Sequence, residues 1–473
     1  MPSDRQLVWF RSDLRIEDHR ALAQARRRGP VIGVVIRSRT QWDAHDRGPN
    51  WLDFWQRGVA ALAQSLKPLN IPLIMLDIDH FDDIPTQLVG LAQRYNCRTL
   101  HFNDEYGIDE RRRDQGVVQQ ARQHDLNIER HVDHVLFRPG DLLTGKGEYY
   151  SVYTPFYKAW LRQLTADKLR QDDAPDAQAP MGDVNTQLLD EMPATAEAII
   201  RQWPAGEAAA QDRLAHFLTR RVQHYAEQRD FPAIAGTSQL SPYLALGMIS
   251  VRQCLNAAAS MNEGRLGDGH QGITTWINEL VWREFYQHIL IAAPRVSMHQ
   301  PFKENTRHLK WLNDRTHFKA WCEGRTGYPL VDAAMRQLNA TGWMHNRLRM
   351  LAATFLSKHL LTDWRWGEAF FMNHLLDGEL GANNGGWQWA ASTGTDSAPY
   401  FRVFNPVTQS ERFDGSGEFI AQWVPELASV PAKQRHFPDA ATRSRCGYPA
   451  PIVDHKVARL RAIDAFKALP SDD

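Results

Sequence analysis

The sequence predicts an α/β domain with a parallel sheet, a long connector and then an all-helical domain. Short apolar runs alternate with helical patterns near the start of the chain, whereas helical periodicity alone continues from Glu207 to the end. A chain of 473 residues also exceeds the size at which one hydrophobic core stops growing. We therefore expect an α/β domain at residues 4–135, a connector at 136–206 and a helical domain at 207–473.

Four apolar runs in the first part have the length and composition of buried parallel strands. They lie at residues 6–10, 31–36, 72–77 and 98–102. Helical patterns at 51–66 and 84–94, with apolar residues three or four positions apart, lie between them. This alternation predicts a Rossmann-like parallel sheet, although the turn after the first run lacks the GxGxxG of a dinucleotide site.

The connector differs in composition from the parts on either side of it. From about Thr165 to Gly206 the chain is rich in Ala, Pro, Asp and Gln, which predicts a solvated segment with few anchoring side chains. The aromatic run at 149–160 opens a helix before it. After Glu207 no convincing strand pattern remains, so the second domain is predicted to be all-α.

Composition excludes several classes of protein. The 55 basic and 55 acidic residues cancel, so any nucleic-acid site must be a local patch. No apolar run approaches the roughly 20 residues of a membrane span. The start at residues 1–5 also lacks the apolar core of a signal peptide, so we expect a cytoplasmic protein. The 4 cysteines are far apart and form no CxxC pair, so no disulfide framework or metal site is indicated.

The most unusual stretch is residues 376–389. It holds two acids, two adjacent asparagines, four glycines and two tryptophans. Carboxylates beside amides suit a polar, ring-shaped partner that forms hydrogen bonds, and glycines let backbone approach it closely. A Gly/Asn turn between two helices, with Trp387 and Trp389 in the core, is the alternative interpretation.

Three further segments combine polar and aromatic residues. Hydroxyls at 237, 238 and 241 precede a helical pattern and form a predicted N-cap cluster, which can bind an anion or simply cap the helix. On the helix at 276–286, four residues share one face, which fits either a ligand surface or an interhelical salt bridge flanked by core aromatics. These four are Glu279, Trp282, Arg283 and Tyr286.

The third segment follows the break at Gly342. Asn346, Arg349 and Met350 fall on one helical face, with Arg347 turned elsewhere and able to reach a phosphate. An amide, a guanidinium and a thioether describe the partner of a polar ring. A pair of helices broken by glycine, with Arg349 in a buried ion pair, fits the spacing equally well.

The runs at 276–286, 326–350 and 377–396 resemble the photolyase/cryptochrome family, and more narrowly class I cyclobutane pyrimidine dimer DNA photolyases. The likeness extends from residues 8–15 to residues 452–456. It implies an N-terminal antenna domain and non-covalently bound FAD, folded into a U within the helical domain. The cofactor-binding residues it implies are Tyr225, Thr237, Ser238, Gln239, Leu240, Ser241, Trp276, Glu279, Arg283, Asn346, Arg349, Asp377, Gly378, Glu379 and Asn383.

The resemblance also implies the reaction. Excited reduced flavin donates an electron to a cyclobutane pyrimidine dimer in DNA, the ring splits, and the electron returns. The implied catalytic residues are Glu279, which hydrogen-bonds the damaged bases, Trp282, which stacks on them, Met350, which packs beside them, and Asn383, which faces the flavin. Similar plant photoreceptors carry an acid at the last position, whereas an amide favours the reduced flavin of a repair enzyme. Photolyases as a group flip their target out of the duplex, so the same is expected of the lesion here.

The DNA-contacting residues that the resemblance and the local patterns imply are Glu279, Trp282, Arg283, Tyr286, Asn346, Arg347, Met350, Trp389 and Arg402. A cryptochrome-like blue-light photoreceptor is the alternative function. A flavin-binding protein without photochemistry is a third. We expect a monomer that binds no metal and no membrane.

Trp311, Trp364 and Trp387 match the family's electron-transfer chain, although from the residues alone Trp364 and Trp311 read as core or rim. His45, Asp109 and Glu110 match positions that bind an antenna pigment, and 5,10-methenyltetrahydrofolate is the pigment we expect. The chain departs from the family's pattern at three places. Asp109 replaces an asparagine, Met298 replaces a lysine, and Glu379 replaces an aspartate. Another antenna therefore stays open.

Overall fold

The computed structural model describes residues 4–189 and 195–470, and it divides into two compact units. The first comprises Met1–Gln223 and Ser238–Pro294, and we call it the sheet unit. The second comprises His224–Thr237 and Arg295–Asp473, and we call it the helical unit. The domain boundaries expected after residues 135 and 206 stay a prediction.

A five-stranded parallel sheet forms the centre of the sheet unit. Its strands, in the order β3-β2-β1-β4-β5, are β1 (Arg5–Phe10), β2 (Val31–Arg37), β3 (Leu73–Asp77), β4 (Cys97–Asn103) and β5 (Asn127–His131). The four predicted strands are confirmed. The fifth was missed because its sequence, NIERH, is polar and contains no apolar run.

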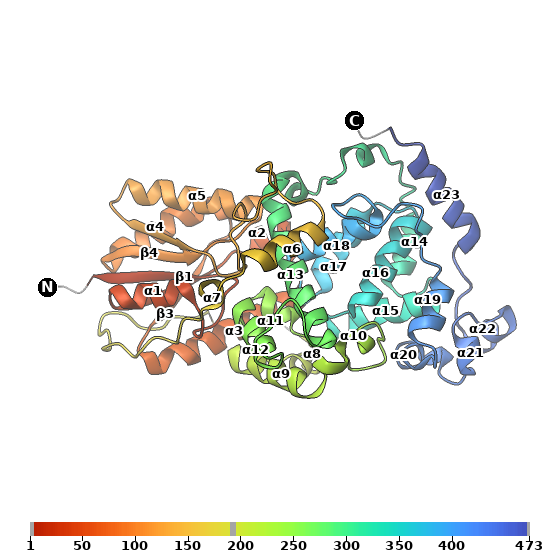
Figure 1. The fold of residues 1–473 in the computed structure, drawn as a ribbon, viewed down its shortest axis with the longest axis horizontal. Helices are drawn as coiled ribbons and strands as arrows, with labels where there is room; N and C mark the ends of the chain where they lie inside the picture. Colours follow the sequence, from red (N-terminus) through yellow and green to blue (C-terminus); the bar gives the residue numbers. More distant parts are fainter. Residues whose placement is uncertain (1–3, 190–194, 471–473) are drawn as a thin grey trace. The chain divides into compact units, whose positions relative to one another are not determined.

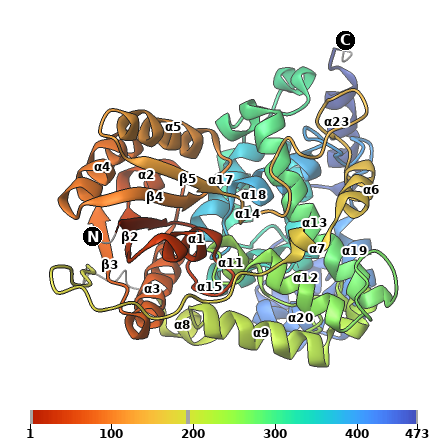
Figure 2. The same cartoon turned by 60° about the vertical axis from the view of Figure 1, so that its left-hand side comes forward.

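Helices cover both faces of this sheet (Figure 1). Figure 2 shows α1 (Arg20–Arg28) and α3 (Pro49–Leu66) on one face, with α4 (Ile84–Arg94) and α5 (Ile108–Arg122) on the other. The predicted helices at 51–66 and 84–94 are thus confirmed. Apolar side chains from the strands and from α4 and α5 make one buried cluster, which includes Leu7, Ile32 and Leu100. The strand order reverses at β1, so the carboxyl ends of β1 and β4 border the crevice where α/β folds bind ligands.

The connector is anchored more firmly than its composition predicts. Gln178 is buried, and its side-chain amide donates to Val31 O at 2.9 Å and accepts from Val31 N at 2.8 Å. The backbone of Gln187 also accepts from Met75 N at 2.8 Å, beside the edge strand β3. Within residues 165–189 a buried side chain thus anchors the connector, which its composition did not indicate, because one amide can complete the hydrogen bonds of a buried strand end. Residues 190–194 of the connector lie outside the described residues.

The sheet unit contains further helices. The predicted helix at 149–160 is confirmed as α6 (Tyr153–Gln163), and α7 (Ala166–Leu169) and α8 (Glu197–Gln202) lie within the connector. Later helices of this unit are α9 (Glu207–Arg220), α11 (Ser241–Ala245), α12 (Val251–Ser260) and α13 (Gln271–Ala292).

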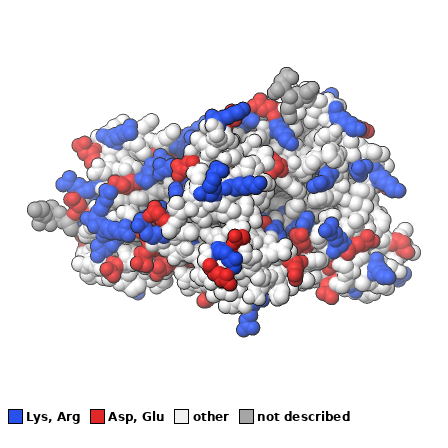
Figure 3. Space-filling view, viewed as in Figure 1, with Lys and Arg blue, Asp and Glu red and all other residues white. Residues whose placement is uncertain are grey.

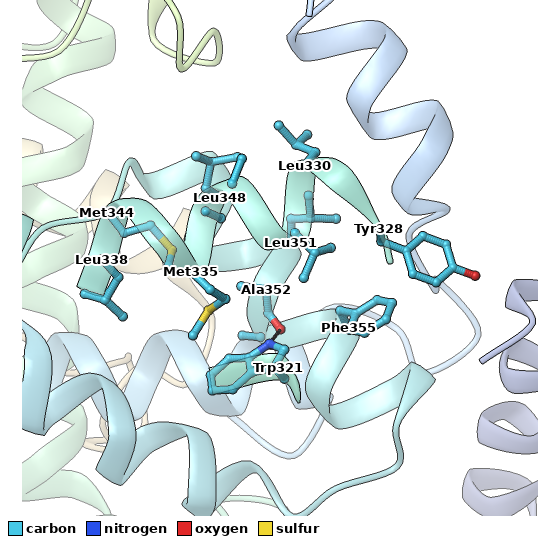
Figure 4. Packing of buried hydrophobic residues seen from close by; sticks show 14 of the residues in the cluster. Trp321, Tyr328, Leu330, Met335, Leu338, Met344, Leu348, Leu351, Ala352 and Phe355 are labelled. Atoms are coloured by element: carbon cyan, nitrogen blue, oxygen red, sulfur yellow. Dashed lines mark hydrogen bonds between the residues drawn. The ribbon is translucent and has the colours of Figure 1, made fainter. Parts of the chain in front are cut away.

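The helical unit contains no strand within its described residues, as predicted. Its helices are α10 (Tyr225–Gln228), α14 (Arg315–Cys322), α15 (Pro329–Thr341), α16 (Asn346–Thr354), α17 (Trp364–His374), α18 (Leu380–Ala391), α19 (Pro406–Phe413), α20 (Glu418–Trp423), α21 (Ala432–Arg435), α22 (Ala440–Cys446) and α23 (His455–Lys467). Figure 4 shows part of its core, where the Trp321 indole donates to Ala352 O at 3.1 Å. Such packing positions α16, α17 and α18.

Across residues 4–189 and 195–470, no helix has the length and apolar character needed to cross a bilayer. The same residues include no group of three or more His, Cys, Asp or Glu side chains arranged to hold a metal ion.

Candidate functional site

The stretch that stood out in the sequence begins with an acid–guanidinium pair in the helical unit. Arg349 of α16 donates to Asp377 Oδ2 at 2.7 Å and to Met344 O at 2.8 Å. The second carboxylate oxygen, Oδ1, is buried and has no hydrogen-bond partner among the described residues. A buried acceptor without a donor is costly, so this oxygen fits a ligand that donates a hydrogen bond to it.

Asn383 lies on the buried side of α18. Its amide nitrogen donates to the backbone oxygen of Glu368 on α17 at 3.0 Å. The next residue, Asn384, donates to Glu368 Oε1 at 2.8 Å, and Gln388 donates to Asn384 Oδ1 at 2.9 Å. His299 lies 3.0 Å from Glu368 Oε2. The bond to Glu368 O orients the Asn383 amide, and the side-chain contacts of Asn384 and Gln388 hold α18 against α17 beside it. The sequence reasoning missed Glu368, because its role depends on how α17 packs against α18 rather than on any spacing.

The three tryptophans of the predicted electron chain all lie in the helical unit. Trp364 and Trp387 are buried, and Trp311 is half-buried. The Trp387 ring lies against Gly367 of α17, where an added Cβ would sit 2.0 Å from Trp387 Cη2. Its neighbours include Phe371, with ring centroids 4.9 Å apart, and its Nε1 is buried without a partner in the described structure. Trp387 is therefore buried, as the alternative interpretation of it as a core residue predicted. Burial does not exclude a role in electron transfer.

The mixed face predicted on one helix of the sheet unit lies on α13. Trp282 stacks on Tyr153 of α6 with ring centroids 3.7 Å apart and an interplanar angle of 9°. The Tyr153 hydroxyl in turn donates to Asn278 O at 2.9 Å. Glu279, Trp282, Arg283 and Tyr286 are all half-buried. The sequence reasoning missed Tyr153, although it had noted the aromatic run that contains this residue.

Arg283 is held in part by backbone groups and contacts the His134 ring. It donates to His134 O at 2.9 Å and to Leu244 O at 3.2 Å. The acid beside it in sequence, Glu284, is fully buried and accepts from the backbone nitrogens of Leu136 and Phe137 at 2.8 and 2.9 Å. Burial raises the pKa of Glu284 to about 7, against the lowering effect of those two hydrogen bonds. Glu284 thus anchors the segment that follows β5 and was not singled out from the sequence.

The predicted N-cap cluster is arranged differently from the expectation. Leu240, not a hydroxyl residue, occupies the N-cap of α11 and forms no side-chain cap, because its side chain has no hydrogen-bond acceptor. Gln239 before it adopts φ +52°, and its side-chain oxygen accepts from Arg213 at 2.8 Å. Ser238 Oγ, two positions earlier, accepts from Leu240 N at 3.4 Å. The expected hydroxyl cap is therefore wrong. Tyr225 and Thr237 belong to the helical unit, whereas residues 238–241, Trp276 and Glu279 belong to the sheet unit.

The predicted DNA-contacting residues of the helical unit differ in their exposure. Arg347 forms an ion pair with Asp230 at 2.7 Å and stacks on Phe413 at 4.5 Å, so its guanidinium is already held. Arg402 and Asn346 are exposed, whereas Met350 and Trp389 are half-buried. Of the predicted cofactor-binding residues nearby in sequence, Glu379 is half-buried and Gly378 is buried. His345 caps α16 by accepting from Arg347 N at 3.2 Å, and burial lowers its pKa to about 4.

The three predicted antenna residues come together in the sheet unit. His45 Nε2 lies 3.3 Å from Asp109 Oδ2, and His45 Nδ1 lies 3.8 Å from Glu110 Oε1. His45 and Glu110 line a cavity of about 70 Å³. Its other walls include Trp9, Trp42, Trp51, Trp55, Phe81, Arg11, Arg47 and Arg113. Aromatic faces beside guanidinium groups suit a planar ligand that carries negative charge.

Two family models match most of the chain. Residues 276–468 match the family model described as the FAD binding domain of DNA photolyase, and residues 6–179 match the model described as DNA photolyase. The deoxyribodipyrimidine photo-lyases of Salmonella typhimurium and Escherichia coli are each 43% identical to this chain over 98% of both chains.

Two solved structures are similar over nearly the whole chain. A class III photolyase from Agrobacterium tumefaciens has a TM-score of 0.89 and 35% identity, and it covers 99% of this chain and 98% of its own. A cryptochrome from Synechocystis sp. has a TM-score of 0.87 and 27% identity, and it covers 98% of this chain and 99% of its own.

Proposed function

This chain belongs to the DNA photolyase family, and from that premise we propose that it is a deoxyribodipyrimidine photo-lyase whose substrate is a cyclobutane pyrimidine dimer in DNA. Its function is light-dependent DNA repair, and its cofactor is FAD. The curated relatives described above are photo-lyases at 43% identity, so the photoreceptor alternative is not carried further. Assignment to class I rests on the motifs of the sequence.

The single observation that carries the cofactor site is the Arg349–Asp377 pair with its unpartnered buried oxygen. Asp377 Oδ1 can accept a hydrogen bond from an N–H or O–H group of the flavin, while Arg349 holds the other carboxylate oxygen at 2.7 Å. Bound reduced FAD supplies, when excited by light, the electron that opens the cyclobutane ring and accepts it back. Asn383 would present an amide rather than an acid to the flavin ring, and an uncharged group there would favour the reduced cofactor over an oxidised one.

We assign lesion binding first to α13 of the sheet unit. Tyr153 fixes the plane of Trp282, and a base of the dimer stacks on the opposite face of that indole. Glu279 lies one helical turn before Trp282 and hydrogen-bonds the damaged bases. Among residues of the helical unit, we assign Met350 to packing on the lesion. Asn346 and Arg402 are exposed, and we assign them to contacts with DNA phosphates.

We assign electron transfer to Trp387, Trp364 and Trp311. Burial of the first two excludes water from the rings, and the half-buried third can exchange an electron with a reductant in solution. Together they would return an oxidised cofactor to its reduced form.

We assign the antenna site to His45, Asp109 and Glu110, with 5,10-methenyltetrahydrofolate as the pigment. The contacts among these residues and the aromatic cavity beside them support this assignment. An absorption spectrum of the purified protein checks it. A strong near-UV band beside the flavin bands supports folate, and flavin bands alone argue against it. A cytoplasmic location and a monomeric state remain predictions of the sequence.

Repair of thymine-dimer DNA tests the function directly. Purified, photoreduced protein is mixed with an oligonucleotide that contains one dimer and is exposed to near-UV or blue light. We expect dimers to disappear under light and to persist in the dark. Dimers that persist under light, in protein shown by its spectrum to hold reduced flavin, would overturn the proposal.

A further inference from the structure

A second polar hollow lies in the sheet unit, apart from the antenna cavity. It has a volume of about 540 Å³, within the roughly 300–1,000 Å³ range of small-molecule sites. Three segments line it: the first turns of α1, the end of β5 with the chain that follows, and α7. Its lining residues are Arg20, Gln24, Glu129, Arg130, His131, Val132, Leu136, Arg138, Asp141 and Lys168.

Positive charge exceeds negative charge in this hollow. Four of its lining residues are arginines or lysines and two are acids. One of those acids, Glu129, is already paired with Arg28 outside the lining at 2.9 Å. Figure 3 shows Lys and Arg side chains gathered over the sheet unit on the face that carries α1, with acidic side chains between them.

Three of the cations, Arg130, Arg138 and Lys168, have fewer carboxylate partners than they have N–H donors. Arg130 and Arg138 both reach the single carboxylate of Asp104, at 2.7 and 3.5 Å. Lys168 lies 3.5 Å from Asp141, and its ammonium also lies over the Phe137 ring at 4.8 Å. Each of these pairings leaves donors on the guanidinium or ammonium group, because an arginine has five N–H donors and a lysine three.

Arg20 has no such pairing. It forms no hydrogen bond or ion pair within the described residues, and its Nε is buried without an acceptor. The nearby carboxylates of Asp18 and Asp133 are held by other arginines: Arg252 contacts both, at 2.9 Å in the case of Asp18. Burial, and then the Arg252 guanidinium, lower the pKa of Arg20. The carboxylates of Asp133, Asp172 and Asp18 act on this pKa in the opposite direction, but none forms an ion pair with Arg20 within the described residues. A half-buried guanidinium without a direct acid partner is stabilised by an anion from solution.

We propose that this hollow binds a compact phosphorylated molecule, with Arg20, Arg130, Arg138 and Lys168 on the phosphate and Gln24 and Asp141 on hydroxyl groups. Arginine forks match phosphate oxygens in pairs. Among the residues that line the hollow, the aromatic ring is that of His131, and it already stacks on His101 with ring centroids 5.6 Å apart. The lining residues include no Trp, Tyr or Phe on which a nucleobase could stack. Carboxylate and amide oxygens on the wall accept hydrogen bonds from hydroxyls. A sugar phosphate therefore fits better than a nucleotide base or a hydrophobic ligand.

A nucleic-acid backbone offers the same phosphate chemistry, but the hollow favours a small molecule over it. Its cations converge on one concave site from three segments, whereas a duplex requires an extended stripe of cations. Two acids on the wall would also repel a long polyanion that passes over them. The site lies outside the residues to which we assign repair, so its test is independent of the repair assay.

Calorimetric titration of the full chain with ribose 5-phosphate and with pyrophosphate, at low salt, tests the proposal. We expect saturable binding of ribose 5-phosphate at one site, weakened about tenfold in Arg20→Gln and in Arg138→Gln. Arg20 pairs with no carboxylate, so Arg20→Gln breaks no ion pair, and Arg138→Gln changes an exposed side chain. If one of the two variants is unstable, the other still measures the effect on binding. The matched control is Arg122→Gln, which removes the same charge from an exposed position on α5.

Three results would overturn the proposal. The first is the absence of saturable binding of either probe. The second is equal weakening by Arg122→Gln, which would show only a general charge effect. The third is displacement of ribose 5-phosphate by a lesion-free oligonucleotide at a lower concentration than pyrophosphate requires, which would assign the hollow to nucleic acid. Binding that is weakened by the two hollow variants alone supports it.

Discussion

Replacement of Gly367 by alanine tests whether the Trp387 ring is fixed by close packing. The added Cβ would sit 2.0 Å from Trp387 Cη2, 2.4 Å from its Cζ3 and 2.6 Å from Leu356 Cδ2. The first contact must lengthen by roughly 1.4 Å before it is ordinary, and the atoms involved belong to a buried ring rather than to a flexible chain end. Overpacking of this kind costs about 1–3 kcal/mol or more.

Helix propensity acts in the opposite direction at this position. Alanine is favoured over glycine in a helix interior by about 1 kcal/mol, so we expect Gly367→Ala to lose about 2 kcal/mol net. Gly386→Ala is the matched control, because Gly386 also lies in a helix of the same unit but a Cβ there meets nothing within 4 Å. That variant should gain about 0.5–1 kcal/mol.

The assay is thermal unfolding of the full chain followed by far-UV circular dichroism. A loss of about 2 kcal/mol should lower the midpoint of the helical unit by about 4 °C or more, while the control raises it slightly. Flavin photoreduction should also slow in Gly367→Ala, because the ring must move. A Gly367→Ala midpoint equal to or above that of Gly386→Ala would refute the packing argument.

Four further predictions concern single contacts. Tyr153→Ala should weaken binding of a thymine-dimer oligonucleotide about threefold to tenfold, measured by fluorescence anisotropy, because it removes the ring that fixes Trp282. The control is Tyr150→Ala, which removes a ring that contacts Phe156 and should leave binding unchanged. Equal weakening by the two variants would contradict the stacking role of Tyr153. Glu284 has a pKa of about 7 in the folded state against 4.5 in the unfolded state, so the folded state binds the extra proton. The stability of the wild type, relative to Glu284→Gln, should therefore fall as pH rises from about 4.5 to 7, by at most about 1.4 kcal/mol per pH unit. A rise in the urea midpoint of the wild type over that range would contradict this sign. Trp387→Phe should slow photoreduction of oxidised flavin about tenfold or more by absorbance under blue light, and an unchanged rate would remove Trp387 from the electron path. Asn383→Asp should destabilise the protein increasingly as pH rises above about 4, because an ionised carboxylate cannot donate a hydrogen bond to Glu368 O as the amide does. The measurement is the difference in melting temperature between the wild type and the variant across pH. A difference that does not change with pH would show that this hydrogen bond does not contribute.

The fold was predictable where burial leaves a pattern in the sequence. The first four strands are apolar runs because both faces of a parallel sheet are covered by helices. β5 lies at the edge of the sheet, where its residues are only partly buried, and its polar sequence carries no such pattern. Gln178 was missed for a related reason, since one buried amide in a polar segment anchors the connector without changing its composition.

The sequence predicted the types of residue in the candidate site, but not the neighbouring groups that orient their side chains. Arg349 and Asp377 are 28 positions apart, and only the resemblance, not the spacing, connects them. Asn383 is oriented by a backbone oxygen of α17, and Trp387 by the absence of a side chain at Gly367 of that same helix. A motif along one helix records which groups meet the ligand, whereas the neighbouring helix determines their positions. A displacement of a site residue by about 1 Å can lower the catalytic rate as much as the loss of a contact does. The helix α17, which sets these positions, is therefore as much a part of the site as α18.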